Sequence, residues 1–394
     1  MNFKTFPTLL VSAALLTVFT ACNKVEDIKP QYQRGGNSLA TDDFGNLVIA
    51  GYTTTSSKGY DAALMLSNSS NGDTLWSKSF GSTYSDAFYS VKKSNEGGFI
   101  ATGFTNKASA GSPSMFVVIT EADGSLVKSI KYGGSQFSEG FCVLPHENAD
   151  SGYLVAGYIQ KSANADRDLY LVRINNAGEL LWENSIGAKS IDPYDTVNDA
   201  AYSIVHAPDG GYFVTGSLNG YNSCCGKIFL MKVSSTGDSL WTKTFNSGIG
   251  FSLALTSDGG VAIGGSLQES SNQEIVIIKT DTAGTLLWEK VYNGSGFEYG
   301  ATMIATADGG FAITGVTDSK GAGYQDAYLI KTNSVGEIQW DNTYGGSDVD
   351  QGFGLIQMND GGFCITGLSN SGGSYIFLNR TSTDGTQLWD KYIQ

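Results

Sequence analysis

Asp308-Gly309-Gly310-Phe311-Ala312-Ile313-Thr314-Gly315 is the stretch that decides the fold, because variants of it recur along almost the whole chain. It joins a turn with two glycines to an apolar segment that closes on a third glycine. Seven copies, spaced 49 to 59 residues apart, close on Gly51, Gly103, Gly157, Gly216, Gly265, Gly315 and Gly367. A regular period of this length is typical of repeat architectures, in which each unit is one supersecondary element.

A second landmark keeps step with the first. Six of the seven units carry a tryptophan four residues after a glycine, at Trp76, Trp182, Trp241, Trp288, Trp340 and Trp389. The second unit is the exception, since Lys128 follows Gly124 at this position. Because the tryptophans share one position in the repeat, we interpret them as spacers packed between neighbouring units.

Each unit is predicted to contain four β-strands. In the sixth unit we expect them over Gly300–Ala305, Gly310–Val316, Ala327–Thr332 and Ile338–Tyr344. The turns between first and second strands carry Asp-Gly-Gly or close variants, and those between third and fourth strands carry a glycine. Glycine accepts the positive φ that tight hairpin turns require, so both kinds of turn are strong hairpin signals.

The third strands are apolar on consecutive residues, as in Ile228-Phe229-Leu230-Met231 and Ile275-Val276-Ile277-Ile278. Strict alternation would leave one face of a strand in water, whereas a continuous apolar run indicates that both faces are buried. Small antiparallel sheets buried on both faces and repeated seven times predict blades stacked around an axis. The expected fold is therefore an all-β, seven-bladed β-propeller with four antiparallel strands per blade.

The composition agrees with this class and excludes one kind of partner. Of 394 residues, 51 are glycine, six are proline and only 16% are charged, which suits short strands and tight turns. The net charge is −14, and the lysines and arginines are not clustered. Phosphate backbones are bound by clustered basic residues, so nucleic acid is not an expected partner.

The N-terminus has the features of an exported lipoprotein. Lys4 precedes an apolar run that is too short to span a membrane comfortably, so residues 1–21 are predicted to be a signal peptide. Phe19-Thr20-Ala21-Cys22 resembles a bacterial lipobox, in which small residues precede the cysteine that receives the lipid. We expect lipidation at Cys22. The alternative is an ordinary cleaved signal followed by a chance cysteine.

The predicted domain organisation follows from this anchor. Residues 22–34 form the lipidated cysteine and a polar tether, and residues 35–394 form the propeller. The acidic pair Glu26-Asp27 resembles the surface-export signal of lipoproteins in the Bacteroidetes group. The expected location is the bacterial cell envelope, at the outer membrane, either periplasmic or surface-exposed, with the membrane contacted through the lipid anchor only.

The units are similar to the seven-bladed β-propeller repeats of bacterial exported proteins, often called SBBP repeats. The resemblance is clearest in Asp326-Ala327-Tyr328-Leu329-Ile330-Lys331 and Tyr344-Gly345-Gly346-Ser347, and it covers roughly residues 35–394. It implies a fold and no single chemistry. The first unit departs from the pattern, with Arg34 where other units carry an acid, which leaves open how the ring closes. Residues 28–33 are a candidate for a further edge strand.

Strand direction sorts the connections onto two faces. The turns between strands one and two, and between three and four, lie on one side, the short-turn face. The connections between strands two and three, and between blades, lie on the other, the long-loop face. Function on a rigid scaffold usually resides in the longer and more variable loops, so candidate residues are sought on the long-loop face.

Acidic residues stand at the start of five of the seven first strands, at Asp86, Glu139, Asp199, Glu298 and Asp350. First strands line the channel of a propeller, so these acids are expected to form a broken ring around one mouth. One interpretation is a site for a basic ligand or a cation, with calcium the candidate ion. The alternative is that each carboxylate accepts hydrogen bonds from backbone of a neighbouring blade.

Aromatic residues gather in the same loops, at Tyr60, Tyr84, Phe137, Tyr194, Tyr221, Phe297 and Tyr324. Exposed rings beside carboxylates and amides suit sugars, whose C–H faces stack while their hydroxyls form hydrogen bonds. They also suit an envelope protein partner. The structural alternative is that most of these rings pack between blades.

The remaining residues give no enzyme signature. The two histidines, His146 and His206, lie beside short turns on the opposite face, and neither a nucleophile elbow nor a metal-binding triad is present. Cys142 and Cys364 fall in apolar strand patterns and are expected to be buried. The adjacent Cys224 and Cys225 are either free thiols or a strained disulfide.

Two catalytic alternatives stay open. Loop carboxylate pairs, Asp192 with Asp195 and Asp348 with Asp350, are compatible with a polysaccharide hydrolase or lyase. The run Ser234–Trp241 resembles the tryptophan-docking repeats of quinoprotein dehydrogenases and of an outer-membrane assembly lipoprotein, although those folds have eight blades. The favoured interpretation is a binding or scaffold propeller without a catalytic residue and without a cofactor.

Overall fold

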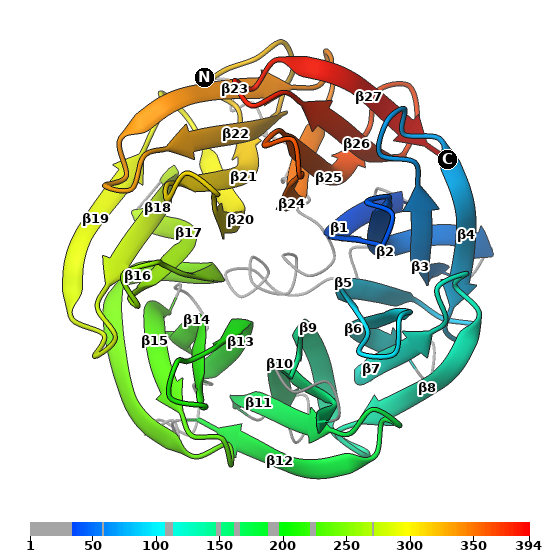
Figure 1. Cartoon of the computed structure of the whole chain (residues 1–394), viewed down its shortest axis with the longest axis vertical. Coiled ribbons are helices and arrows are strands. Elements are labelled where there is room, and N and C mark those ends of the chain that lie inside the picture. The colour runs from blue at the N-terminus through cyan, green and yellow to red at the C-terminus, as the bar shows by residue number, and fades with distance from the viewer. Residues whose placement is uncertain are drawn as a thin grey trace, which may run out of the picture.

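The computed structural model arranges short antiparallel sheets around a central axis, like the blades of a fan (Figure 1). The structure describes residues 34–56, 59–106, 113–146, 151–160, 166–187, 197–220, 226–269 and 272–394. Every element in these ranges is a β-strand. These ranges contain no helix that could span a membrane.

The strands of the first three blades follow one another in chain order. Blade 1 contains β1 (Arg34–Thr41), β2 (Leu47–Ser56), β3 (Gly59–Ser67) and β4 (Thr74–Phe80). Blade 2 contains β5 (Asp86–Lys93), β6 (Phe99–Asn106), β7 (Pro113–Thr120) and β8 (Leu126–Tyr132). Blade 3 contains β9 (Phe137–Pro145), β10 (Tyr153–Gln160), β11 (Arg167–Ile174) and β12 (Leu180–Ile186). Arg34, assigned to the tether by the sequence analysis, thus lies in β1.

Blades 4 and 5 share one long strand, β16, whose first half is the outer strand of blade 4 and whose second half is the inner strand of blade 5. Their strands are β13 (Asn198–His206), β14 (Tyr212–Gly220), β15 (Lys227–Val233), β16 (Ser239–Leu255), β17 (Val261–Glu269), β18 (Asn272–Thr280) and β19 (Leu286–Tyr292). Blade 6 contains β20 (Glu298–Ala305), β21 (Phe311–Thr317), β22 (Asp326–Thr332) and β23 (Ile338–Tyr344). Blade 7 contains β24 (Asp350–Gln357), β25 (Phe363–Ser369), β26 (Tyr375–Thr381) and β27 (Gln387–Ile393).

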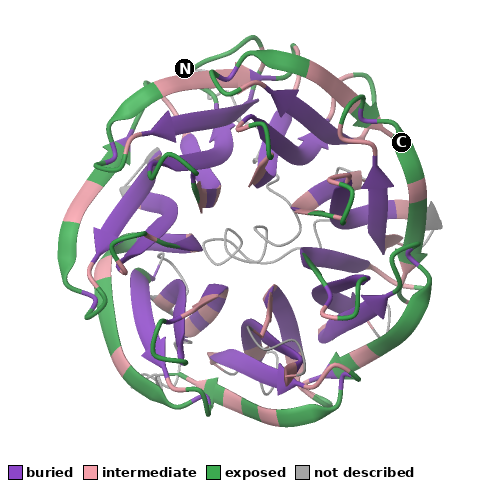
Figure 2. Ribbon diagram, in the orientation of Figure 1, coloured by how far each residue is buried: buried purple, intermediate pink, exposed green. Residues whose placement is uncertain are grey.

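These strands confirm the predicted fold: the chain is an all-β, seven-bladed propeller with four antiparallel strands in each blade. In blade 6 the observed strands match the predicted ones to within two residues at either end. Third strands such as β15 and β22 are buried on both faces, whereas fourth strands such as β23 are exposed or half-buried along most of their length. Figure 2 shows this as a buried interior surrounded by an outer ring of exposed and half-buried residues.

The tryptophans pack between blades, as their shared position in the repeat indicated. Each contacts the glycine in the turn between third and fourth strands of the following blade, and a Cβ added at Gly336 would lie 2.8 Å from Trp288 Cζ3. That turn therefore requires glycine both for its positive φ and for the close approach of the indole. In blade 2, which lacks the tryptophan, Ile130 contacts Gly178 instead.

Among the described residues, the ring closes through side-chain contacts, and no strand is exchanged between blades 1 and 7. Blades 1 and 7 are each formed by four consecutive strands. Trp389 packs against Gly72, where an added Cβ would lie 2.7 Å from the indole, and Lys391 Nζ lies 3.0 Å from Asp73 Oδ1. The backbone N–H of Arg34 also donates to Ser374 Oγ at 3.1 Å. The edge strand suggested for residues 28–33 lies outside the described residues.

Candidate functional site

The predicted acids occupy the start of the first strands, but their side chains are buried and already bonded. Asp86, Glu298 and Asp350 each accept a hydrogen bond from the backbone N–H four residues earlier, and each of these bonds is 2.7 Å long. Each carboxylate thus fastens the connection from the preceding blade. Burial raises the pKa of the Asp86 and Asp350 carboxyls, and these hydrogen bonds oppose the shift.

Glu139 is bonded differently. Its two oxygens accept hydrogen bonds from the hydroxyls of Tyr158, at 2.9 Å, and Tyr89, at 3.2 Å. The guanidinium carbon of Arg167 lies 4.6 Å from the centre of the Tyr158 ring. Burial raises the pKa of Glu139, while Tyr158, the Arg167 charge and Tyr89 oppose this. Asp199 is also fully buried.

A cation ring at the channel mouth needs carboxylates that converge. Within the described ranges, no three histidine, cysteine, aspartate or glutamate side chains gather closely enough to hold a metal ion. The described acids instead bond to their own connections or to tyrosines. Calcium at this mouth therefore stays a prediction.

The predicted aromatic residues separate into exposed and packed rings. Tyr324 is 79% exposed, whereas Tyr84 and Phe137 are half-buried. Phe297 is also half-buried and stacks on Tyr299, with ring centroids 6.2 Å apart and planes inclined by 3°. Tyr60 packs against Tyr52 at a centroid distance of 5.1 Å. Outside the described residues lie Cys22, Asp192, Tyr194, Asp195, Tyr221, Cys224 and Cys225.

Tyr324 stands on a well-anchored loop between β21 and β22. The backbone N–H groups of Ala322 and Gly323 donate to Asp326 Oδ2 at 3.0 and 3.1 Å. The backbone carbonyl of Gln325 accepts from Asp350 N at 2.8 Å, which ties the loop to blade 7. The ring is thus held out in water by a fixed backbone, with the exposed Asp318 and Lys320 on the same loop.

The structure also reveals a site that sequence reasoning missed. Every first strand contains a β-bulge, and the extra residue of each bulge lines the central channel. These residues are Asn37, Tyr89, Phe141, Tyr202, Phe251, Ala301 and Phe353. A bulge redirects a side chain that would otherwise point at a neighbouring blade. The only sequence signal was an aromatic residue that recurs in first strands.

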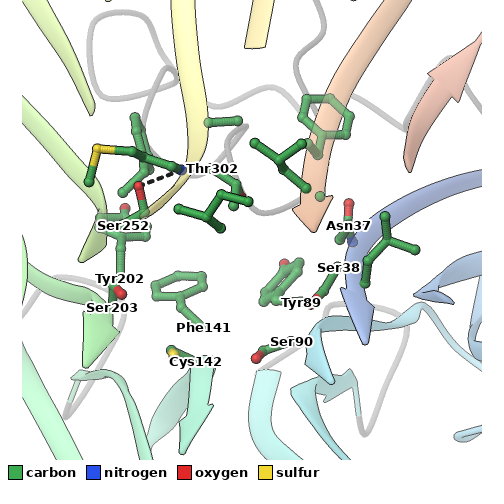
Figure 3. A pocket seen from close by; sticks show the side chains of 18 of the residues that line it. Asn37, Ser38, Tyr89, Ser90, Phe141, Cys142, Tyr202, Ser203, Ser252 and Thr302 are labelled. Atoms are coloured by element: carbon green, nitrogen blue, oxygen red, sulfur yellow. Dashed lines mark hydrogen bonds between the residues drawn. The ribbon is translucent and has the colours of Figure 1, made fainter. Parts of the chain in front are cut away.

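These residues surround a cavity with a volume of about 290 Å³, lined by the first strands of all seven blades. Figure 3 shows Tyr89, Phe141 and Tyr202 projecting into it. Consecutive rings touch along four blades, with centroid distances of 5.3 Å from Tyr89 to Phe141, 4.7 Å from Phe141 to Tyr202 and 5.3 Å from Tyr202 to Phe251. We call these four residues the aromatic arc.

The two cysteines that the sequence predicts to be buried differ in their exposure. Cys364 is buried as expected, and burial raises the pKa of its thiol to about 12. Cys142 is only half-buried and lines the channel, so the prediction that it is buried was wrong. The reason is its place directly after the bulge at Phe141, which turns that part of β9 towards the channel. The His206 Nε2 atom lies 2.8 Å from the carbonyl oxygen of Pro145.

Comparison with known proteins supports the fold and goes no further. No protein-family model matches the chain, and no curated protein matches it. Among solved structures it is similar to the BP39L lectin from Burkholderia pseudomallei, at 8% identity and a TM-score of 0.56, covering 92% of this chain and 100% of the lectin. The Dos1 propeller is similar at 10% identity and a TM-score of 0.54, covering 95% of this chain and 84% of that one.

A third similar structure is Sqt1 from Chaetomium thermophilum bound to the N-terminus of the ribosomal protein L10. It is 11% identical with a TM-score of 0.52, and the match covers 92% of this chain and 89% of Sqt1. All three identities are too low to carry a ligand or a partner across. They agree with the β-propeller fold.

Proposed function

We propose that this chain is a non-catalytic binding propeller of the bacterial envelope, anchored to the outer membrane through lipid on Cys22, that recognises carbohydrate on its long-loop face. The observation that carries the carbohydrate proposal is Tyr324. It is the predicted aromatic residue that stands 79% exposed on a fixed loop.

Sugar recognition suits the chemistry around this ring. The C–H face of a pyranose packs against an aromatic ring, and its hydroxyls form hydrogen bonds with nearby charged and backbone groups. Asp318 and Lys320 are exposed on the Tyr324 loop, and Ser347 is exposed on the adjoining connection to blade 7. Because the loop is held by Asp326 and Asp350, little conformational entropy is lost on binding.

The proposal of a binder without catalysis is supported by the state of the acids. A hydrolase or lyase needs a carboxyl that can reach the substrate. Asp350 is fully buried, and its Oδ2 accepts from Gly346 N. In the pair Asp348 and Asp350, one member is therefore withheld from any ligand on the surface.

A protein partner is the second candidate, and a different observation favours it. The outer strands carry aliphatic side chains that are about half exposed next to the interblade tryptophans, at Leu75, Leu181, Leu240, Leu287 and Leu388. In blade 2, Val127 occupies the same position, next to Lys128. Exposed apolar rows of this kind are typical of contact surfaces between proteins. A pull-down from envelope extract addresses this candidate if carbohydrates do not bind.

The test of the carbohydrate proposal is a glycan-array screen of the full chain, with and without calcium. We expect binding to a limited set of glycans, and loss of that binding in Tyr324→Ala. Phe44→Ala is the matched control, because Phe44 is 90% exposed in the turn between β1 and β2 on the short-turn face. An array without specific binding under either condition contradicts the proposal. Binding only with calcium would support the predicted cation.

Membrane attachment has its own test. Cys22→Ser is expected to move the protein from the membrane fraction to the aqueous fraction on detergent phase separation. Unchanged partition would contradict the lipid anchor.

A further inference from the structure

We propose that the central channel is a second binding site, which takes a small molecule with a flat apolar ring and an anionic group. The site is separate from Tyr324 and does not rest on the carbohydrate proposal. The proposal is supported by the positions of the channel wall at which single blades carry a residue type different from that of the other blades.

The apolar side of the site is the aromatic arc. Five of the seven bulge positions carry Tyr or Phe, and the four rings of the arc form one continuous surface. Ala301 leaves the wall open beside Phe251, where another ring would narrow the channel. Flat ligands gain by packing against aromatic rings in offset or edge-on geometry. The volume of about 290 Å³ lies near the lower limit for ligand pockets, which points to a single small molecule.

The polar side is Lys92. In every blade, the residue three positions after the bulge pairs with the second-strand residue that lies three positions before the closing glycine. These seven residues are therefore equivalent. Six blades carry an aliphatic residue there, namely Ala40, Leu144, Val205, Ala254, Ile304 and Ile356. Blade 2 carries Lys92, the one charged residue among those described in the cavity wall.

Lys92 also forms no ion pair with another described residue, although the chain has a net charge of −14. Lys92 is exposed at the wall of the channel, so its ammonium group is accessible to an anionic group of a ligand. The charge at Lys92 therefore selects the anionic end of the ligand.

Asn37 adds a second polar departure in the adjacent blade. It replaces the aromatic residue at the bulge, and its Nδ2 donates to the carbonyl of Phe88 at 2.8 Å. This bond fixes the amide, and Asn37 Oδ1 has no hydrogen-bond partner among the described residues. A buried acceptor without a partner is costly, so a ligand or a water molecule that donates to it would be stabilised.

The wall itself is rigid. The hydroxyl that follows the bulge accepts a hydrogen bond from the next blade, as Ser90 Oγ does from Val143 N at 3.3 Å and Ser252 Oγ from Met303 N at 2.9 Å. These bonds join neighbouring first strands across the gaps between blades. A preorganised pocket binds without first paying for its own ordering.

The experiment uses two fluorescent probes with the full chain. Anilinonaphthalenesulfonate has flat rings and an anionic sulfonate, and N-phenylnaphthylamine has similar rings and no charge. We expect Lys92→Met to weaken binding of the anionic probe about tenfold and to leave the neutral probe unchanged. Lys243→Met, on the outer strand β16, is the matched control and should change neither.

A second variant keeps the test independent of folding effects. Ala301→Phe places in blade 6 the residue that blades 3, 5 and 7 already carry, so it narrows the channel without removing a core side chain. It should weaken both probes while the melting temperature is kept. The proposal is overturned if the wild type binds neither probe, or if Lys92→Met and Ala301→Phe both bind the two probes as tightly as the wild type, since the probes would then lie on the outer surface. Carbohydrate binding should be unaffected throughout.

Discussion

The joints between blades and the wall of the channel are formed by the same repeat, but the residue types recur at the joints and vary along the wall. At the joints the same contact recurs, with a tryptophan of one blade on the turn glycine of the next, as for Trp288 and Gly336. Along the wall, equivalent positions carry Asn37, Tyr89 or Ala301. A residue type that recurs at one position in every blade is explained by the architecture. A residue type that differs from the others at an equivalent position is instead free to serve ligand binding.

The largest effect is expected at a joint. Trp288→Ala should lower the free energy of unfolding by about 3 kcal/mol, because it leaves a cavity between blades 5 and 6. The neighbouring Leu287 is 55% exposed, so Leu287→Ala should cost less than about 0.5 kcal/mol. Denaturant unfolding of both variants checks this. Equal losses would mean that the tryptophans do not hold the blades together.

A smaller effect separates backbone strain from packing at two glycines. Both Gly336 and Gly309 have positive φ, at 77° and 83°, but an added Cβ meets Trp288 only at Gly336. Gly309→Ala should cost about 1 kcal/mol from strain alone. Gly336→Ala should cost about 1 kcal/mol more, from overpacking against the indole. Similar melting temperatures for the two variants would remove the packing argument.

The smallest effect concerns the charged pairs under the short turns. Asp258 lies 3.1 Å from the buried Lys279, and hydrogen bonds from Thr256 and Gly260, together with Lys279, hold its pKa at about 2. A depressed pKa gives stability that is present above the ordinary value of 3.8 and is lost as the pH falls through 2.

Asp258→Asn should therefore lose less than about 1 kcal/mol at neutral pH, because the carboxylate is largely exposed. The difference in the free energy of unfolding between the wild type and Asp258→Asn should disappear as the pH falls from 3.8 to 2. Denaturant midpoints across that range measure it. A difference in the free energy of unfolding that does not change with pH would show that the charge of Asp258 is not the source of the stabilisation.

The fold could be predicted because its signals are local and repeated. The turn glycines and tryptophans occur at fixed spacing, so blade number, strand order and the role of Trp288 followed from the sequence. The long shared strand β16 did not, because Gly248 stands where five other blades carry an acid and nothing in the pattern marks the join.

The sites were harder to predict because they depend on pairing between strands. A bulge exists only relative to a partner strand, so the sequence could not show that Phe141 points into the channel while Ser138 and Glu139 are buried. The same limit applies to the acids. Asp86 and Asp350 are acidic and lie near a mouth, but only the folded structure shows that the Oδ2 atom of each already accepts a hydrogen bond from a backbone N–H group.

The most direct test of the account is the affinity of a glycan selected on the array, measured by titration calorimetry with Tyr324→Ala and Phe44→Ala. The account predicts that Tyr324→Ala loses affinity about tenfold or more, at an unchanged melting temperature, while Phe44→Ala binds like the wild type. Equal affinity of the two variants would contradict recognition on the long-loop face.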